Sequence, residues 1–183
     1  MENIIIRPAV TADAKDLLEI YAPYVLTTPI TFEVSVPTLA DFQNRIETIR
    51  SKFPYFVAVS GNKIVGYTYA SSFKGRAAYD WSVETSIYVA DTCRGKGIGQ
   101  QLYQALEDAL KKQHIHNVCA CITYPNNASI SFHESFGFET VAHFHKSGYK
   151  FDSWHDMIWM EKFICEHEDK PPAFIPYPEL SSK

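Results

Sequence analysis

The chain has 183 residues, of which 46% are hydrophobic and 14% aromatic, and its formal net charge at pH 7 is −4. This length and composition favour a globular domain with a sizeable buried core and argue against a disordered chain. The acidic balance argues against a protein that binds duplex nucleic acid, because such proteins usually carry a concentrated basic face.

The N-terminal sequence has no basic stretch followed by an apolar run, which argues against a signal peptide. The chain contains no apolar run of about 18 residues, the length needed to cross a bilayer. We therefore expect a cytoplasmic protein whose four cysteines are reduced thiols, with neither a membrane nor a nucleic acid as a partner.

The first 37 residues predict a strand, a helix and a loop. Residues 4–6 are apolar and strand-like, and the spacing of apolar residues over 11–25 favours a helix with Thr11 as its N-cap. Residues 26–37 contain two prolines and three threonines, so we expect an exposed loop.

A second helix and a strand hairpin follow. Thr38 with Asp41 is typical of a capping-box variant, and a helix is expected to continue through Ile49. The strand-like segments 55–60 and 64–71 flank a short glycine-containing turn.

The second half of the chain alternates strands and helices. A polar loop leads to a strand, a glycine-rich bend and an amphipathic helix. The expected elements are a strand over 81–89, a helix over 98–110, a strand over 118–122, a helix over 127–136 and strands over 138–146 and 154–162.

The resulting order, β-α-α-β-β-β-α-β-α-β-β, indicates a mixed α+β domain over residues 1–165. The remaining residues, 166–183, form a proline-rich tail. Its four prolines between residues 170 and 180 argue against a helix or a central strand, so we expect it to lie extended over the surface or against a second subunit.

The glycine-rich bend, Arg94-Gly95-Lys96-Gly97-Ile98-Gly99, comes directly after a strand and opens a helix. Glycines let consecutive backbone N–H groups point into one concavity, and a helix N-terminus adds a positive dipole, so this bend predicts a phosphate site. A plain surface turn is the alternative. The spacing lacks the Gly-Lys-Ser/Thr of a P-loop and the last glycine of a dinucleotide fingerprint.

The bend resembles the Arg-x-x-Gly-x-Gly pyrophosphate loop of the GNAT superfamily of N-acetyltransferases. A second stretch, "NNASISFHESFGF" (residues 126–138), is similar to that superfamily's Asn-x-x-Ala-x-x-Leu-Tyr-x-x-x-Gly-Phe pattern. The resemblance spans about residues 3–163. It implies the acyl-CoA N-acyltransferase fold, a mixed and mostly antiparallel sheet of about seven strands flanked by helices, with acetyl-CoA as co-substrate.

Three further stretches, "TFE" (31–33), "KGRAAYDWSVETSIYV" (74–89) and "GYKFDSWHDMIWMEKF" (148–163), resemble the phosphinothricin acetyltransferase group. That resemblance implies acetylation of the α-amine of a small amino-acid-like substrate, phosphinothricin or methionine sulfoximine, in detoxification or resistance. The alternatives are an acetyltransferase for another amine (an amino acid, a polyamine or a protein N-terminus) and a non-catalytic sensor of acetyl-CoA.

The resemblance also implies which residues hold the donor. The 87–89 backbone would pair with the pantetheine arm like an added strand, splayed from the next strand, and an N–H of Tyr88 or Val89 would polarise the thioester carbonyl. The expected donor-binding residues are Ile87, Tyr88, Val89, Arg94, Gly95, Lys96, Gly97, Ile98, Gly99, Asn126 and Ser129.

Acetyl transfer also needs a base, because an amine enters mostly protonated. Glu84 is our candidate, directly or through a water. Period-2 alternation places it on one strand face with Ser86 and Tyr88, and apolar surroundings would raise its pKa. His133 stands where many superfamily members have a tyrosine acid, so it either protonates the thiolate or shapes the pocket.

The acceptor side is argued from charge, because a substrate with a carboxylate and a second anionic group needs cations. Lys74 and Arg76 match the motif of the group, with an ordinary solvated loop as the alternative. The expected substrate-binding residues are Phe32, Glu33, Phe73, Lys74, Arg76 and Tyr79.

Three pairs of potential metal ligands, Cys119-x-Cys121, His114-x-His116 and His143-x-His145, lack partners at zinc spacing, so we expect no metal. Cys119 and Cys121 fit better as small apolar residues on one strand face. We expect a homodimer, with the aromatic segment 154–159 and the tail as candidate surfaces.

Overall fold

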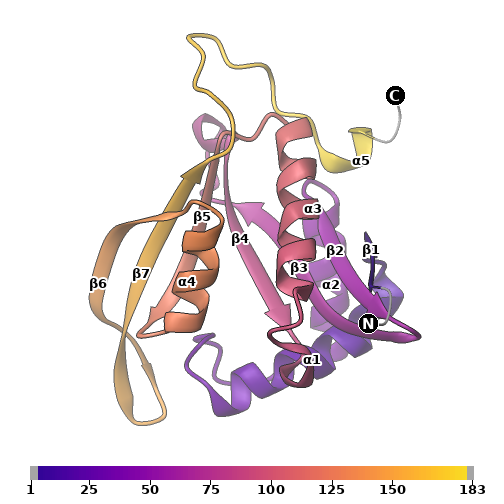
Figure 1. Ribbon diagram of the computed structural model, residues 1–183, viewed down its shortest axis with the longest axis vertical. Helices are drawn as coiled ribbons and strands as arrows, with labels where there is room; N and C mark the ends of the chain where they lie inside the picture. Colours follow the sequence, from indigo (N-terminus) through magenta and orange to yellow (C-terminus); the bar gives the residue numbers. More distant parts are fainter. Residues whose placement is uncertain (1–3, 181–183) are drawn as a thin grey trace.

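A twisted seven-stranded sheet runs through the part of the protein that the computed structural model describes, residues 4–180 (Figure 1). The strand order is β1-β2-β3-β4-β5-β7-β6, and every neighbouring pair is antiparallel except β4 and β5. The expected mixed, mostly antiparallel sheet is confirmed. The strands are β1 (Ile4–Pro8), β2 (Tyr55–Ser60), β3 (Lys63–Ser72), β4 (Ser82–Val89), β5 (Asn117–Tyr124), β6 (Glu139–Lys150) and β7 (Ser153–Phe163).

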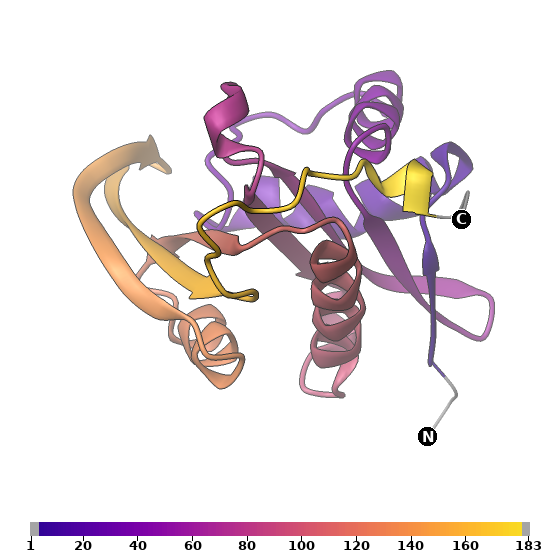
Figure 2. The same cartoon turned by 90° about the horizontal axis from the view of Figure 1, so that it is seen from above.

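Helices cover both faces of the sheet (Figure 2). The α-helices are α1 (Ala14–Thr27), α2 (Leu39–Arg50), α3 (Ile98–Lys112), α4 (Asn127–Ser135) and α5 (Tyr177–Leu180). Residues of α3 such as Leu102 and Leu106 centre one apolar core, and α1 and α2 contribute Leu17 and Ile46 to a second core on the opposite face. Val83, Ile87 and Val89 of β4 pack in the first core and Tyr88 in the second, which agrees with the period-2 pattern.

Strands β4 and β5 separate along their length. They pair only where Ser82–Glu84 meets Asn117–Cys119, whereas β4 continues to Val89 and β5 stays paired with β7 as far as Tyr124. Beyond Glu84 the β5-facing edge of β4 therefore has no strand partner. We call this gap the donor slot, and it is the splay that the resemblance implied.

Local capping signals were partly right. The Thr38–Asp41 capping box is confirmed, since the Asp41 backbone N–H donates to Thr38 Oγ1 over 3.1 Å. Thr11 is not the cap of α1: a short 3₁₀ turn precedes that helix, and the Thr11 hydroxyl donates to Glu47 instead. The helix also continues to Thr27, so the loop expected from residue 26 starts at residue 28.

The proline-rich tail docks on its own domain rather than projecting from it. Trp81 Nε1 donates to the Pro172 carbonyl over 2.7 Å, and the Phe174 ring lies 5.6 Å from that of Phe53. We expected no helix in the tail, but a single helical turn, α5, forms there. Proline is tolerated in it because Pro178 lies in the first turn, where a backbone N–H has no intrahelical partner. Residues 181–183 of the expected tail lie outside the described range.

None of the helices in residues 4–180 combines the length and apolarity that a membrane span requires.

Candidate active site

A cavity of about 340 Å³ opens at the donor slot, between the end of β4, the glycine-rich bend and the N-terminus of α4. It brings together most of the expected donor-binding residues, with Tyr24 as a wall that the sequence did not indicate. The expected residues that line it are Ile87, Val89, Arg94, Gly95, Gly97, Ile98, Gly99, Asn126 and Ser129. Tyr88 packs on the opposite face of β4, and Lys96 Nζ donates to the Thr92 carbonyl, so these two lie outside the lining.

The bend has the backbone geometry that an anion site needs. Gly95 and Gly97 have φ values of 72° and 76°, and Gly97 is the N-cap residue of α3. Such left-handed conformations turn backbone N–H groups toward one concavity, at the positive end of a 15-residue helix. A Cβ built on Gly95 would meet no atom within 4 Å, so the space beside the bend is open. The arrangement fits a diphosphate group.

Tyr24 of α1 holds the end of β4, the strand that borders the donor slot. Its hydroxyl donates to the Val89 carbonyl over 2.7 Å and lies 3.3 Å from the Val89 N–H, which donates to it. The Arg94 guanidinium lies 5.1 Å from the Tyr24 ring centroid and pairs with Asp91. One side chain thus links α1, β4 and the glycine-rich bend. The sequence carried no signal for this contact, because Tyr24 and Val89 are 65 positions apart.

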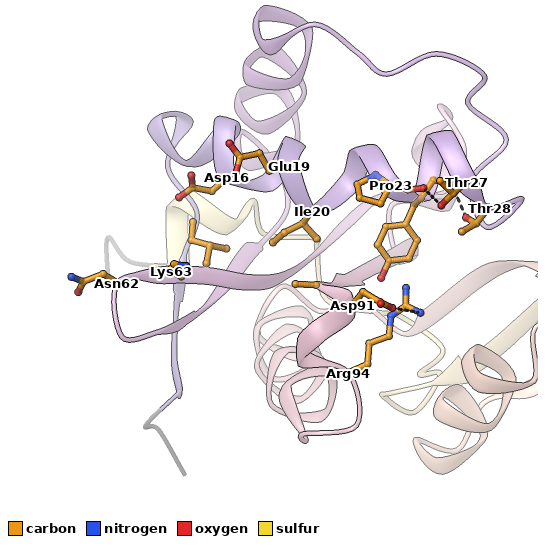
Figure 3. A pocket seen from close by; sticks show the side chains of 13 residues that line it. Asp16, Glu19, Ile20, Pro23, Thr27, Thr28, Asn62, Lys63, Asp91 and Arg94 are labelled. Atoms are coloured by element: carbon orange, nitrogen blue, oxygen red, sulfur yellow. Dashed lines mark hydrogen bonds and ion pairs between the residues drawn. The ribbon is translucent and has the colours of Figure 1, made fainter.

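A larger hollow, of about 630 Å³, lies between α1 and the β2–β3 turn and shares Tyr24 and Arg94 with the donor cavity (Figure 3). Its lining carries three carboxylates, those of Asp16, Glu19 and Asp91. Carboxylates repel phosphate groups, so this hollow is a poorer donor site than the smaller cavity beside the glycines.

Glu84 is the last residue of β4 that β5 covers. In register it lies between Ser71 of β3 and Cys119 of β5, so it stands at the closed end of the donor slot. Its side chain is half-buried, and burial raises the pKa of the Glu84 carboxyl, an effect that the Lys74 ammonium opposes. The expected direction of the pKa shift is confirmed.

Lys74 lies over an aromatic wall close to Glu84. Its ammonium is 5.1 Å from the Phe73 ring and 5.6 Å from the Trp159 ring, and the Tyr79 ring is 5.8 Å from that of Phe73. Arg76 is exposed in the same loop. Trp159 comes from β7, where it pairs with the exposed Cys121, and neither residue carried a sequence signal for this position. Of the two cysteines expected on one face of this strand, Cys119 is buried and Cys121 is exposed.

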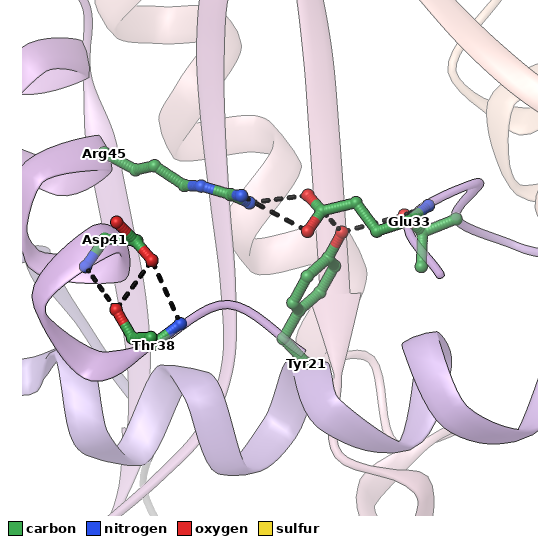
Figure 4. A network of polar contacts seen from close by, with 6 residues as sticks. Tyr21, Glu33, Thr38, Asp41 and Arg45 are labelled. Atoms are coloured by element: carbon green, nitrogen blue, oxygen red, sulfur yellow. Dashed lines mark hydrogen bonds and ion pairs between the residues drawn. The ribbon is translucent and has the colours of Figure 1, made fainter. Parts of the chain in front are cut away.

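Glu33 is held by protein partners. It accepts two hydrogen bonds from the Arg45 guanidinium, at 2.6 and 3.2 Å, and one from the Tyr21 hydroxyl at 3.1 Å (Figure 4). The Tyr21 hydroxyl also lies 2.8 Å from Thr31 Oγ1. Glu33, which we expected to bind substrate, therefore anchors the 28–37 segment between α1 and α2.

The same segment is fastened to the β6–β7 hairpin. Phe32 packs so closely on Gly148 that a Cβ there would come within 2.4 Å of the ring. The buried ammonium of Lys150 donates to the carbonyls of Thr28 and Thr31, each over 2.8 Å. The segment is the loop we expected, with Phe32 and Val34 exposed, and these contacts hold it as a wall beside the slot.

Replacing Lys150 with methionine tests this anchor. We expect the free energy of unfolding to fall by about 1–3 kcal/mol, because two carbonyls lose their donor in a buried setting. Chemical denaturation measures the loss, and Lys146→Met, at an exposed lysine of the same hairpin, is the control. Equal stability of the two variants would contradict the anchor.

His133 lies in the core rather than in the cavity lining. It is 4% exposed, its Nδ1 is 2.8 Å from the Ser129 carbonyl, and aromatic rings of Tyr103, Phe132 and Phe138 surround it. Burial lowers the pKa of the imidazole, which favours its neutral form. Of the two roles left open above, the structure favours shaping the pocket over proton donation.

The fold, the glycine-rich bend and the slot define an acetyltransferase, and the chain belongs to the GNAT acetyltransferase family: the model of the acetyltransferase (GNAT) domain matches residues 6–159. Among curated proteins, it is 37% identical over 161 residues to the phosphinothricin N-acetyltransferase of Streptomyces coelicolor, covering 86% of this chain and 94% of that one. It is 34% identical over 158 residues to the L-methionine sulfoximine/L-methionine sulfone acetyltransferase of Pseudomonas aeruginosa, covering 85% and 92%.

Among solved structures, a GNAT superfamily phosphinothricin acetyltransferase from Sinorhizobium meliloti in complex with AcCoA superposes with a TM-score of 0.89. The two are 34% identical, and the match covers 96% of each chain.

Proposed function

We propose that the protein transfers acetyl from acetyl-CoA to the α-amine of a small amino-acid-like substrate, with phosphinothricin and methionine sulfoximine as the leading candidates. The observation that carries the proposal is the donor slot, with an anion-binding bend at its open end and Glu84 at its closed end. The resemblance to relatives that act on these two substrates supports the choice of acceptor.

The donor is held by backbone more than by side chains. The amides of residues 95–99 clasp the diphosphate, and the open edge of β4 pairs with the pantetheine arm. Asn126 lines the cavity from the opposite side, where its Oδ1 accepts from the Ser129 N–H over 3.2 Å and caps α4. A β4 backbone N–H polarises the thioester carbonyl and stabilises the oxyanion that forms.

Glu84 removes the proton of the acceptor ammonium, directly or through a water, so that the neutral amine attacks the thioester carbon. Its raised pKa makes it a stronger base than an ordinary glutamate. Lys74 and Arg76 bind the anionic groups of the substrate, and Phe73, Tyr79 and Trp159 form the wall against its aliphatic stem.

A substrate panel tests the acceptor class. Release of free thiol is measured with phosphinothricin and methionine sulfoximine, against glutamate, spermidine and an N-terminal alanine peptide. We expect kcat/KM to be at least about tenfold higher for one of the first two than for the others, a difference of about 1.4 kcal/mol in transition-state binding.

Two other results would redirect the proposal. Turnover with spermidine or the peptide alone would show a different acceptor while keeping the enzyme class. Tight binding of acetyl-CoA without turnover of any amine would favour a sensor.

Tyr24→Phe tests how the end of β4 is held beside the donor slot. Removing the hydroxyl frees both Val89 backbone groups but keeps the ring beneath Arg94. We expect KM for acetyl-CoA to rise about tenfold, the equivalent of about 1.4 kcal/mol, because the two hydrogen bonds that hold the end of β4 are lost. Tyr149→Phe, at an exposed tyrosine of the β6–β7 hairpin, is the control and should leave KM unchanged.

We also propose a homodimer formed through the β6–β7 hairpin. Large apolar side chains are exposed there, with Trp154 at 61% and Tyr149 at 55%, and such a patch favours protein contacts. Light scattering should give twice the chain mass. A role in detoxification or resistance, a cytoplasmic location and the lack of a nucleic-acid partner stay predictions.

A further inference from the structure

Two histidines of β6 and an aspartate of β7 converge on the β6–β7 hairpin, and none of the three lines the donor cavity. His143 Nε2 lies 2.8 Å from Asp156 Oδ2, and His145 Nδ1 lies 3.0 Å from the same oxygen. The ring centroids of the two histidines are 4.2 Å apart. We expected no partner for this histidine pair, and that expectation was wrong, because Asp156 comes from the neighbouring strand.

The backbone explains why the three side chains meet. His143 and His145 are two positions apart on a strand, which places their side chains on one face. The pairing of β6 with β7 shifts register between Phe144 and Gly148, and Lys146 has a φ of 50°. Such a bulge re-aims the side chains beside it, and here it directs His145 toward β7.

The hydrogen-bond pattern resembles the surroundings of a metal ligand. Asp156 Oδ1 accepts from the Lys146 backbone N–H over 2.8 Å, which fixes the carboxylate and leaves Oδ2 for the imidazoles. On the other side, the Tyr124 ring packs 4.8 Å from the His143 ring.

We propose that His143, His145 and Asp156 form a binding site for a divalent transition-metal ion of the zinc class. Imidazole nitrogen and carboxylate oxygen are ligands that zinc takes in proteins. No two of the three ligand atoms are more than 4.8 Å apart. Ligands at about 2.1 Å around a tetrahedral ion stand roughly 3.4 Å from one another, so small side-chain rotations suffice to receive it.

Zinc fits this cluster better than magnesium or calcium, which prefer sites made of oxygen ligands. His143 and His145 are exposed and Asp156 is half-buried, so the ion has an open path from solvent. Three protein ligands leave a position for water or for a group from another molecule.

Calorimetry with zinc chloride alone, on untagged protein, tests the site. We expect one ion per chain, with affinity at least about tenfold weaker in His145→Ala. His145 is the most exposed of the three side chains, so its loss should leave the fold intact. His167→Ala is the matched control, because His167 is also exposed and bonds a neutral side chain, Asn117.

Cobalt substitution gives an independent reading of the ligands. The visible spectrum should show nitrogen and oxygen ligation and should disappear in Asp156→Asn. A thiolate-to-cobalt charge-transfer band would overturn the proposal, because it would assign the ion to a cysteine such as the exposed Cys121. Zinc binding of equal strength in His145→Ala, or no binding by the parent protein, would also overturn it.

Discussion

Glu84→Gln should lower kcat/KM for the acceptor by a factor of roughly 10²–10⁴ while leaving acetyl-CoA binding nearly unchanged. The glutamine keeps the size of the side chain at the closed end of the slot but cannot accept a proton. Steady-state kinetics gives the first quantity and calorimetry with acetyl-CoA the second. A variant that kept most of its turnover would remove Glu84 from the mechanism.

The pH dependence gives a separate test of the same residue. A base must be deprotonated to act, and burial raises the pKa of Glu84, so kcat/KM should rise with pH through a limb above the ordinary glutamate range. Lys74 opposes this shift, since its positive charge favours the carboxylate. Lys74→Met should therefore move the limb to still higher pH.

As pH rises, the stability of the protein should fall while its activity rises. Because the pKa of Glu84 is higher in the folded than in the unfolded protein, the folded state binds more protons between the two values. The free energy of unfolding therefore falls as pH rises through that window. Glutamine does not ionise, so Glu84→Gln places no charge in this half-buried site. The Tm of the variant should therefore exceed that of the parent at neutral pH and match it in acid.

Most local signals in the sequence were reliable, although Thr11 is not the N-cap that its position indicated. The glycine-rich bend combines a strand end, two left-handed glycines and a helix start within a few residues, and the structure has each of them where expected. The Thr38–Asp41 box is similarly local. Such features depend on neighbouring residues alone, so a single sequence is enough to read them.

Contacts between distant segments were not predictable. Tyr24 reaches Val89 only because α1 crosses the end of β4, and Trp159 reaches Lys74 only because β7 pairs with β5. Asp156 meets His145 through a register shift that no spacing reveals. His133 was ambiguous for the same reason, since its burial depends on which rings surround it.

Gly97→Ala should weaken donor binding by a factor of roughly 10–100, or about 1.4–2.7 kcal/mol. Gly97 has a φ of 76°, so a side chain there strains the bend and turns its N–H groups away from the diphosphate. The added Cβ would also stand 3.3 Å from Gln100 Oε1. Calorimetry with coenzyme A measures the change.

Gly61→Ala separates lost binding from lost stability. Gly61 has a φ of 57° in the β2–β3 turn, and a Cβ there would meet no atom within 4 Å, so this variant carries backbone strain away from the donor cavity. Both variants should lose about 1–2 kcal/mol of stability, whereas only Gly97→Ala should lose affinity. Equal affinities would mean that the bend is merely a turn, because its backbone geometry would then contribute nothing to holding the donor.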